Sequence, residues 1–153
     1  MEIKQALRGT ISILGLSEAD LAKLTPLAKE VGFEGGDLIL LSGERSKAFY
    51  VLMSGSAAVE VTGDFYSVCI QALAPGDAFG WSSLLDDQTT LFQVRAREQC
   101  SALLLNGPAV TALCHEDPAL GVKLLELTLR TVVGRVRGLE LRLAEFGGFQ
   151  RNG

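Results

Sequence analysis

The stretch that decides the fold is "GGDLILLSGERSKAFYVLMSGSAAV", residues 35 to 59. It holds two short apolar runs, "LILL" from residue 38 and "AFYVLM" from residue 48, with glycines at positions 36, 43 and 55 around them. Short apolar runs bounded by glycine are typical of strands joined by tight turns. The stretch therefore predicts antiparallel β-structure.

The pattern of short apolar runs separated by turn residues continues to Leu105. The runs "YSVCIQAL" and "QVRAREQCSALLL" follow, with turn signals at Gly63 and at Pro75-Gly76. In "FQVRAR", residues 92 to 97, apolar and polar residues alternate, so the apolar face should line the interior and the polar face, arginines included, should point outward. We predict an antiparallel β-roll, or jelly roll, over residues 33–105.

Helical patterns flank this predicted roll, which makes the fold class α+β. In "LSEADLAKLTPLAKEV", Ser17 and Asp20 approximate a capping box, and Gly32 should end the helical segment 1–32. Two helices are predicted over 108–146, a short one in "PAVTALCHED" and a long one that begins at Pro118 and ends before Gly147-Gly148. We expect one domain, residues 1–146, and a flexible tail, 147–153.

Composition excludes several functional classes. The net charge of −4 and the pI near 5.0 argue against a general affinity for nucleic acid. No apolar run is long enough to cross a bilayer and the first residues lack a cleavage site, so we expect a cytoplasmic protein without membrane contact. The cysteines, Cys69, Cys100 and Cys114, are odd in number and outside any CxxC pair, so we expect reduced, mostly buried thiols and no metal site.

The long closing helix carries a heptad pattern. Apolar residues recur at alternating spacings of three and four, which is typical of a two-stranded coiled coil. Arg135 falls at a g position and Glu140 at the following e position, where opposite charges meet across a parallel pair. The predicted homodimer interface consists of Val122, Leu125, Leu129, Val132, Arg135, Val136, Leu139, Glu140 and Leu143, with Phe146 as the last heptad residue.

An alternative is that this stripe packs on the chain's own roll, as most amphipathic helices do. Against it, a second apolar set remains on the flank to serve the domain: Leu120, Leu124, Leu127 and Leu141.

A roll between a preceding helix and a long closing helix resembles the cyclic nucleotide-binding domain family. The stretch 35–59 looks like that family's glycine-punctuated strands, and "LAPGDAFG", residues 73 to 80, resembles the approach to its phosphate-binding cassette. The resemblance covers about residues 14–146. It is greatest to the effector half of catabolite-activator and FNR-type regulators, in which the closing helix pairs two subunits. Those regulators continue into a helix-turn-helix domain, whereas only "GGFQRNG" follows here, so we expect a protein partner and no direct DNA binding.

The resemblance also implies a degenerate cassette. In the family a glutamate directly after "FG" binds the ribose hydroxyl and an arginine near the end of the cassette binds the phosphate. Here Trp81 takes the glutamate position and Thr90 the arginine position, while Asp86 and Asp87 add negative charge. We therefore do not expect tight binding of cyclic AMP or cyclic GMP. The cassette residues are Phe79, Gly80, Trp81, Ser82, Ser83, Leu84, Thr90 and Leu91.

Trp81 allows three interpretations. The indole can fill the emptied pocket beside Phe79 and Leu85, stack on a different flat ligand with the nearby hydroxyls, or form an exposed anchor for a protein. We favour the first, and with it a stand-alone, dimeric regulatory domain without a cofactor. A sensor of another small molecule in the same pocket is the alternative.

An enzyme is the remaining class. Cys114 and His115 are adjacent on a predicted helix and so project in different directions, which makes them a poor nucleophile and base. The carboxylates of Asp86-Asp87 and Glu116-Asp117 are better explained as loop or cap residues. We predict no catalytic residues.

Overall fold

The computed structural model describes residues 15–43, 47–84 and 92–147. Within these ranges two four-stranded antiparallel sheets face each other, with strand orders β1-β8-β3-β6 and β2-β7-β4-β5. The strands are β1 (Ala28–Phe33), β2 (Leu38–Leu40), β3 (Ala48–Ser54), β4 (Ala57–Thr62), β5 (Ser67–Leu73), β6 (Ala78–Phe79), β7 (Phe92–Ala96) and β8 (Cys100–Asn106). The predicted α+β fold with a β-roll is confirmed.

Pairing between distant segments closes the roll. β8 lies between β1 and β3, with Ala102 opposite both Val31 and Leu52, and β4 lies between β5 and β7. The apolar residues of both sheets form one core cluster around Leu52, Val59 and Phe79. A second cluster joins the other face of β3 and β8 to the helices. Gln93, expected to point outward, is buried instead, and its amide donates to Glu60 Oε1 at 2.7 Å.

The N-terminal helix, α2 (Glu18–Leu24), has the predicted capping box: Ser17 and Asp20 each accept a hydrogen bond from the other's backbone N–H. The prediction that the helical segment runs to residue 32 is wrong. A 3₁₀ turn, η2 (Thr25–Leu27), follows α2, and the chain then continues as β1. Pro26 contributes to the early end, because it has no backbone N–H to donate to the carbonyl four residues before it.

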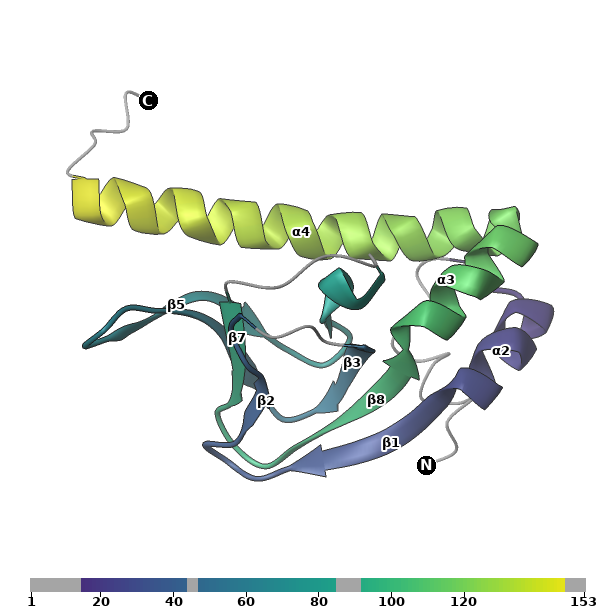
Figure 1. Cartoon of the computed structure of the whole chain (residues 1–153), viewed down its shortest axis with the longest axis horizontal. Coiled ribbons are helices and arrows are strands. Elements are labelled where there is room, and N and C mark those ends of the chain that lie inside the picture. Colours follow the sequence, from purple (N-terminus) through teal and green to yellow (C-terminus); the bar gives the residue numbers. More distant parts are fainter. Residues whose placement is uncertain (1–14, 44–46, 85–91, 148–153) are drawn as a thin grey trace.

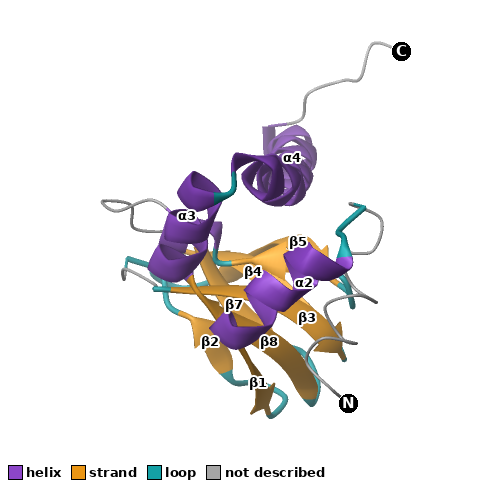
Figure 2. Ribbon diagram, turned by 90° about the vertical axis from the view of Figure 1, so that its right-hand side faces the viewer, coloured by secondary structure: helices purple, strands orange, loops and turns teal. Residues whose placement is uncertain are grey.

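Two helices follow the roll as predicted, α3 (Gly107–Glu116) and α4 (Pro118–Gly147). Asn106 caps α3 by accepting a hydrogen bond from the Ala109 N–H at 2.9 Å. In Figure 1, α4 runs along the whole length of the roll, and α2 and α3 gather near its first turns. Figure 2 shows α4 nearly end-on above the strands. None of the helices in the described part of the chain is long and apolar enough to span a membrane.

Two glycines let α4 approach β5 closely. A Cβ at Gly138 would overlap the carbonyl oxygen of Ile70, and one at Gly134 would lie 2.6 Å from Gln71 Nε2. Farther along, Arg142 Nε donates to the carbonyl of Cys69 at 2.8 Å. The middle of α4 is thereby held against the roll.

Candidate functional site

The cassette begins at a tight turn. Gly80 has φ +78°, and a Cβ at this position would lie 2.6 Å from the carbonyl oxygen of Ala48, so the turn requires glycine. The 3₁₀ turn η3 (Trp81–Leu84) follows. The Ser83 N–H and Ser83 Oγ both donate to the Gly80 carbonyl, at 3.0 and 2.7 Å. The Ser83 hydroxyl therefore stabilises the turn.

Trp81 is half-buried and packs against the core cluster that joins the roll to the helices. Its expected neighbour Phe79 belongs to the other cluster, where it stacks on Tyr50 with ring centroids 4.9 Å apart. Leu85, the second expected neighbour, lies outside the described residues. The inward-packed interpretation of Trp81 fits this position better than an exposed anchor, and a contact of Trp81 with Phe79 stays a prediction.

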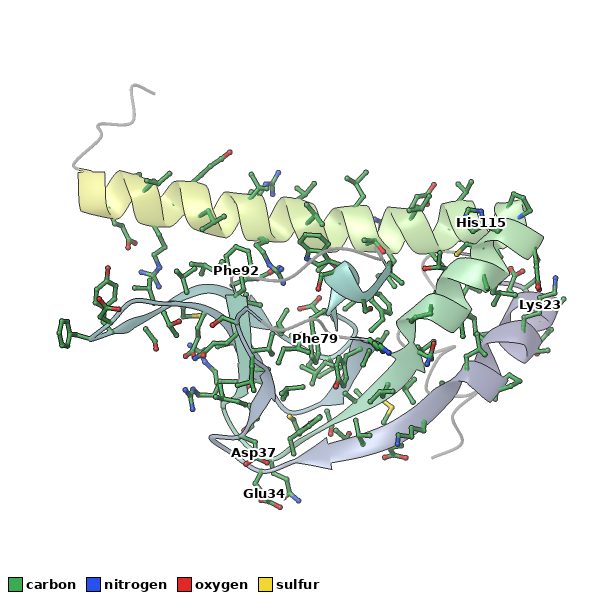
Figure 3. The ribbon with its side chains drawn as sticks, in the orientation of Figure 1. Lys23, Glu34, Asp37, Phe79, Phe92 and His115 are labelled. Carbon is green, nitrogen blue, oxygen red and sulfur yellow. The ribbon has the colours of Figure 1, made fainter. Side chains whose placement is uncertain are left out.

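The structure adds a residue that the sequence analysis placed elsewhere. Arg135 of α4 is only 6% exposed, and its guanidinium carbon lies 5.6 Å from the centroid of Trp81 and 4.8 Å from that of Phe92. Figure 3 shows Phe92 between the roll and the underside of α4. The prediction that Arg135 reaches Glu140 of a second subunit is therefore wrong, because its side chain is buried against two rings of its own domain.

The Arg135 cation is poorly compensated. Burial lowers its pKa to about 10. Within the described ranges no carboxylate forms an ion pair with it, whereas Arg95 pairs with Glu60 and Arg142 with Glu145. The Nε of Arg135 and the indole Nε1 of Trp81 are both buried without a hydrogen-bond partner.

We call the space around these groups the α4-capped pocket. It is lined by Leu40, Gly80, Trp81, Ser82, Phe92, Val94 and Arg135. About 10 Å³ remains there for the centre of a water-sized sphere, which is room for about one water.

The predicted cassette residues that the structure describes lie in three different places. Gly80, Trp81 and Ser82 line the pocket, whereas Phe79 lies inside the roll and Leu84 against the helices. Thr90 and Leu91, like Asp86 and Asp87, lie outside the described residues.

The outward face of α4 is the second candidate site. Most predicted seam residues are exposed there, and Leu129, at 62%, is typical. Val132 is half-buried, and Leu139 packs against the roll. Val133 is also exposed, and so is Leu141, which was expected to serve the domain. The exposed row consists of Val122, Leu125, Leu129, Val133, Val136 and Leu143.

Cys114 and Asp117, which were considered for catalysis, lie in surroundings that suit a structural role. Burial raises the pKa of the Cys114 thiol, the opposite of what a nucleophile requires. Asp117 accepts a hydrogen bond from the Leu120 N–H at 3.2 Å, as a cap does, and pairs with Lys23 at 2.6 Å. In the parts of the chain that are described, no group of histidine, cysteine or carboxylate side chains could hold a metal ion.

Comparisons with known proteins agree with this architecture. Over 84 residues the chain is 31% identical to a cGMP-dependent protein kinase of Caenorhabditis briggsae, an alignment that covers 54% of this chain and 11% of the kinase. The chain thus spans about a tenth of that relative's length.

Two solved structures share the fold. A cyclic nucleotide-binding domain of Methylobacillus flagellatus superposes with a TM-score of 0.78 at 17% identity and covers 93% of this chain and 84% of its own. The catabolite activator protein of Thermus thermophilus superposes with a TM-score of 0.68 at 26% identity, over 86% of this chain and 62% of its own. The cyclic nucleotide-binding domain family matches residues 30–117, more than half of the sequence, and the chain belongs to that family.

Proposed function

We propose that this chain is a dimeric regulatory domain whose cassette does not bind cyclic AMP or cyclic GMP tightly. The observation that carries the proposal is the position of Arg135 over the rings of Trp81 and Phe92, because these three side chains line the pocket and leave little space in it. A nucleotide could enter only if α4 withdrew Arg135 and Trp81 moved.

The chemistry of the cassette supports the same conclusion. A ribose hydroxyl would meet the indole of Trp81 where the family has a carboxylate. Each lost charged hydrogen bond costs about 1.5–3 kcal/mol, and each 1.4 kcal/mol is about tenfold in affinity. Two such losses move a micromolar site toward millimolar.

The outward face of α4 supports dimerisation. The helix is 30 residues long, which corresponds to about 45 Å, and its exposed row extends over most of that length. An apolar row of this extent on one exposed face is typical of a protein interface. A parallel pairing of two α4 helices would bury it while each roll stays outside.

A second candidate is a sensor of another small molecule. It is favoured by the two buried donors, Trp81 Nε1 and Arg135 Nε, that have no partner in the pocket. Such donors suit a ligand that accepts hydrogen bonds.

Titration calorimetry with cyclic AMP and cyclic GMP tests the proposal. We expect no binding tighter than about 100 μM, in keeping with the two lost contacts. Sub-micromolar binding of either nucleotide would contradict it. Native mass spectrometry of the purified protein distinguishes the two candidates, because a stoichiometric small molecule would favour the sensor.

A further inference from the structure

We infer that the α4-capped pocket binds one compact monoanion, a halide or a small carboxylate, through the guanidinium of Arg135. The inference rests on the second candidate under the proposed function, the sensor, since it assigns a ligand class to that same pocket.

Arg135 supplies a positive charge to attract the anion and N–H groups to orient it. Its guanidinium carbon lies over two aromatic rings, 5.6 Å from the centroid of Trp81 and 4.8 Å from that of Phe92. A stacked guanidinium can still donate hydrogen bonds in its own plane, and a buried charge is stable only when it is paired. Arg135 is 6% exposed and its Nε has no acceptor.

A second donor belongs to the same pocket. The indole N–H of Trp81 is buried without an acceptor. Ser82, also buried, adds a hydroxyl to the lining, and the other lining residues are Leu40, Gly80, Phe92 and Val94. Among the residues that the structure describes, the lining offers hydrogen-bond donors and no carboxylate, which favours an acceptor with negative charge over a cation.

The remaining space selects a small ligand. It admits about one water-sized particle, so a halide or one end of a carboxylate fits with little adjustment of the side chains. The depressed pKa of Arg135 agrees with a cation that lacks an anion, and a bound anion would raise that pKa again.

Trp81 is the only tryptophan in the chain, so the protein's indole fluorescence reports on this pocket. Bromide quenches indole fluorescence on contact. The test is a titration of the wild-type protein with sodium bromide, in which sodium gluconate keeps the ionic strength constant. We expect quenching that saturates and that chloride reverses. Reversal by acetate as well would extend the site to carboxylates, whereas reversal by chloride alone would restrict it to halides. Quenching that rises linearly, unaffected by chloride, would overturn the inference.

Variants of Arg135 test whether its guanidinium binds the anion. Arg135→Gln should weaken bromide binding about tenfold or more, the effect of losing one charged hydrogen bond, and Arg135→Lys should retain part of it. Saturable quenching of equal affinity in Arg135→Gln would also overturn the inference, provided that circular dichroism shows both proteins folded. The wild-type titration decides the matter even if a variant fails to fold. Calorimetry with cyclic AMP separately decides the proposed function, so the two can fail independently.

Discussion

Arg135 of α4 lies over the face of Trp81, with its guanidinium carbon 5.6 Å from the ring centroid, and this contact joins the closing helix to the cassette. In most proteins a cation so deeply buried is paired. Here two aromatic rings take the place of a counter-ion, and attraction between a cation and a ring recovers only part of the hydration that is lost. The helix and the cassette are therefore coupled through a well-packed contact in which the loss of hydration of the cation is only partly compensated.

Substitutions at Trp81 should separate its packing from its polar group. Trp81→Phe keeps a ring beneath Arg135 and removes the unpaired N–H, so we expect a change in unfolding free energy of less than about 1 kcal/mol. Trp81→Ala leaves a cavity and should cost about 2–3 kcal/mol, less than for a fully buried tryptophan. Urea denaturation followed by circular dichroism measures both. Equal losses for the two variants would show that the packing assigned to Trp81 is wrong.

The two glycines of α4 offer a matched pair. Alanine favours helix over glycine by about 1 kcal/mol at either position. At Gly134 the added methyl meets the end of the flexible Gln71 side chain, so Gly134→Ala should leave stability unchanged or raise it. At Gly138 it meets the backbone of Ile70, so Gly138→Ala should cost about 1–3 kcal/mol. Thermal unfolding compares them, and a Gly138→Ala protein as stable as Gly134→Ala would mean that α4 does not sit this close to β5.

The fold was predictable because its signals are local. The capping box at Ser17, the cap at Asn106 and the glycine-bounded runs each act within a few residues of their own position. β1 was missed because Ala28 and Val31 continue the helical spacing of the preceding leucines, whereas its conformation is set by pairing with β8, more than 60 residues later. Likewise, Gln93 is buried because Glu60 of the neighbouring strand accepts its hydrogen bond, and an alternation rule cannot include that partner.

The site was harder to predict because its central residue belongs to a distant element. The heptad pattern placed Arg135 at a subunit interface opposite Glu140, because the pattern contains only residues of the closing helix and not the rings of the roll that cover Arg135. The spacing of residues along α4 does contain a signal for the burial of Arg135. Starting at Leu120, the buried residues of α4 recur at three or four positions, through Leu124, Leu127 and Thr131, and Arg135 is the next member of this series. A charged residue on the buried face was thus visible in the periodicity, although the rings that receive it were not.

Asp20 should make stability depend on pH. Its hydrogen bond from Lys123 Nζ, 2.8 Å long, lowers the pKa of the carboxyl below its ordinary value of 3.8. A carboxyl with a depressed folded pKa stabilises the protein above the unfolded value, and this contribution is lost as the pH falls through the folded pKa. Asp20→Asn should therefore lose about 1 kcal/mol at pH 7 and progressively less below about pH 4.

Urea denaturation at neutral and acid pH measures this difference. Lys23→Met, which removes the exposed pair with Asp117, is the control and should change stability little at any pH. A difference between wild type and Asp20→Asn that persists at about pH 2 would show that the carboxylate charge is not its source.

The outward row of α4 gives the sharpest test of dimerisation, because the helix carries two residues of similar exposure on different faces. Val136, 46% exposed, lies on the predicted seam, and Leu141, 49% exposed, lies on its flank. Val136→Asp should convert a micromolar dimer to monomer, since two buried carboxylates would face each other. Leu141→Asp should leave the dimer intact, and both monomer folds should survive because both side chains already meet solvent. Light scattering measures the mass. A wild-type protein that is monomeric at micromolar concentration, or dissociation by both variants alike, would show that the seam is not the interface.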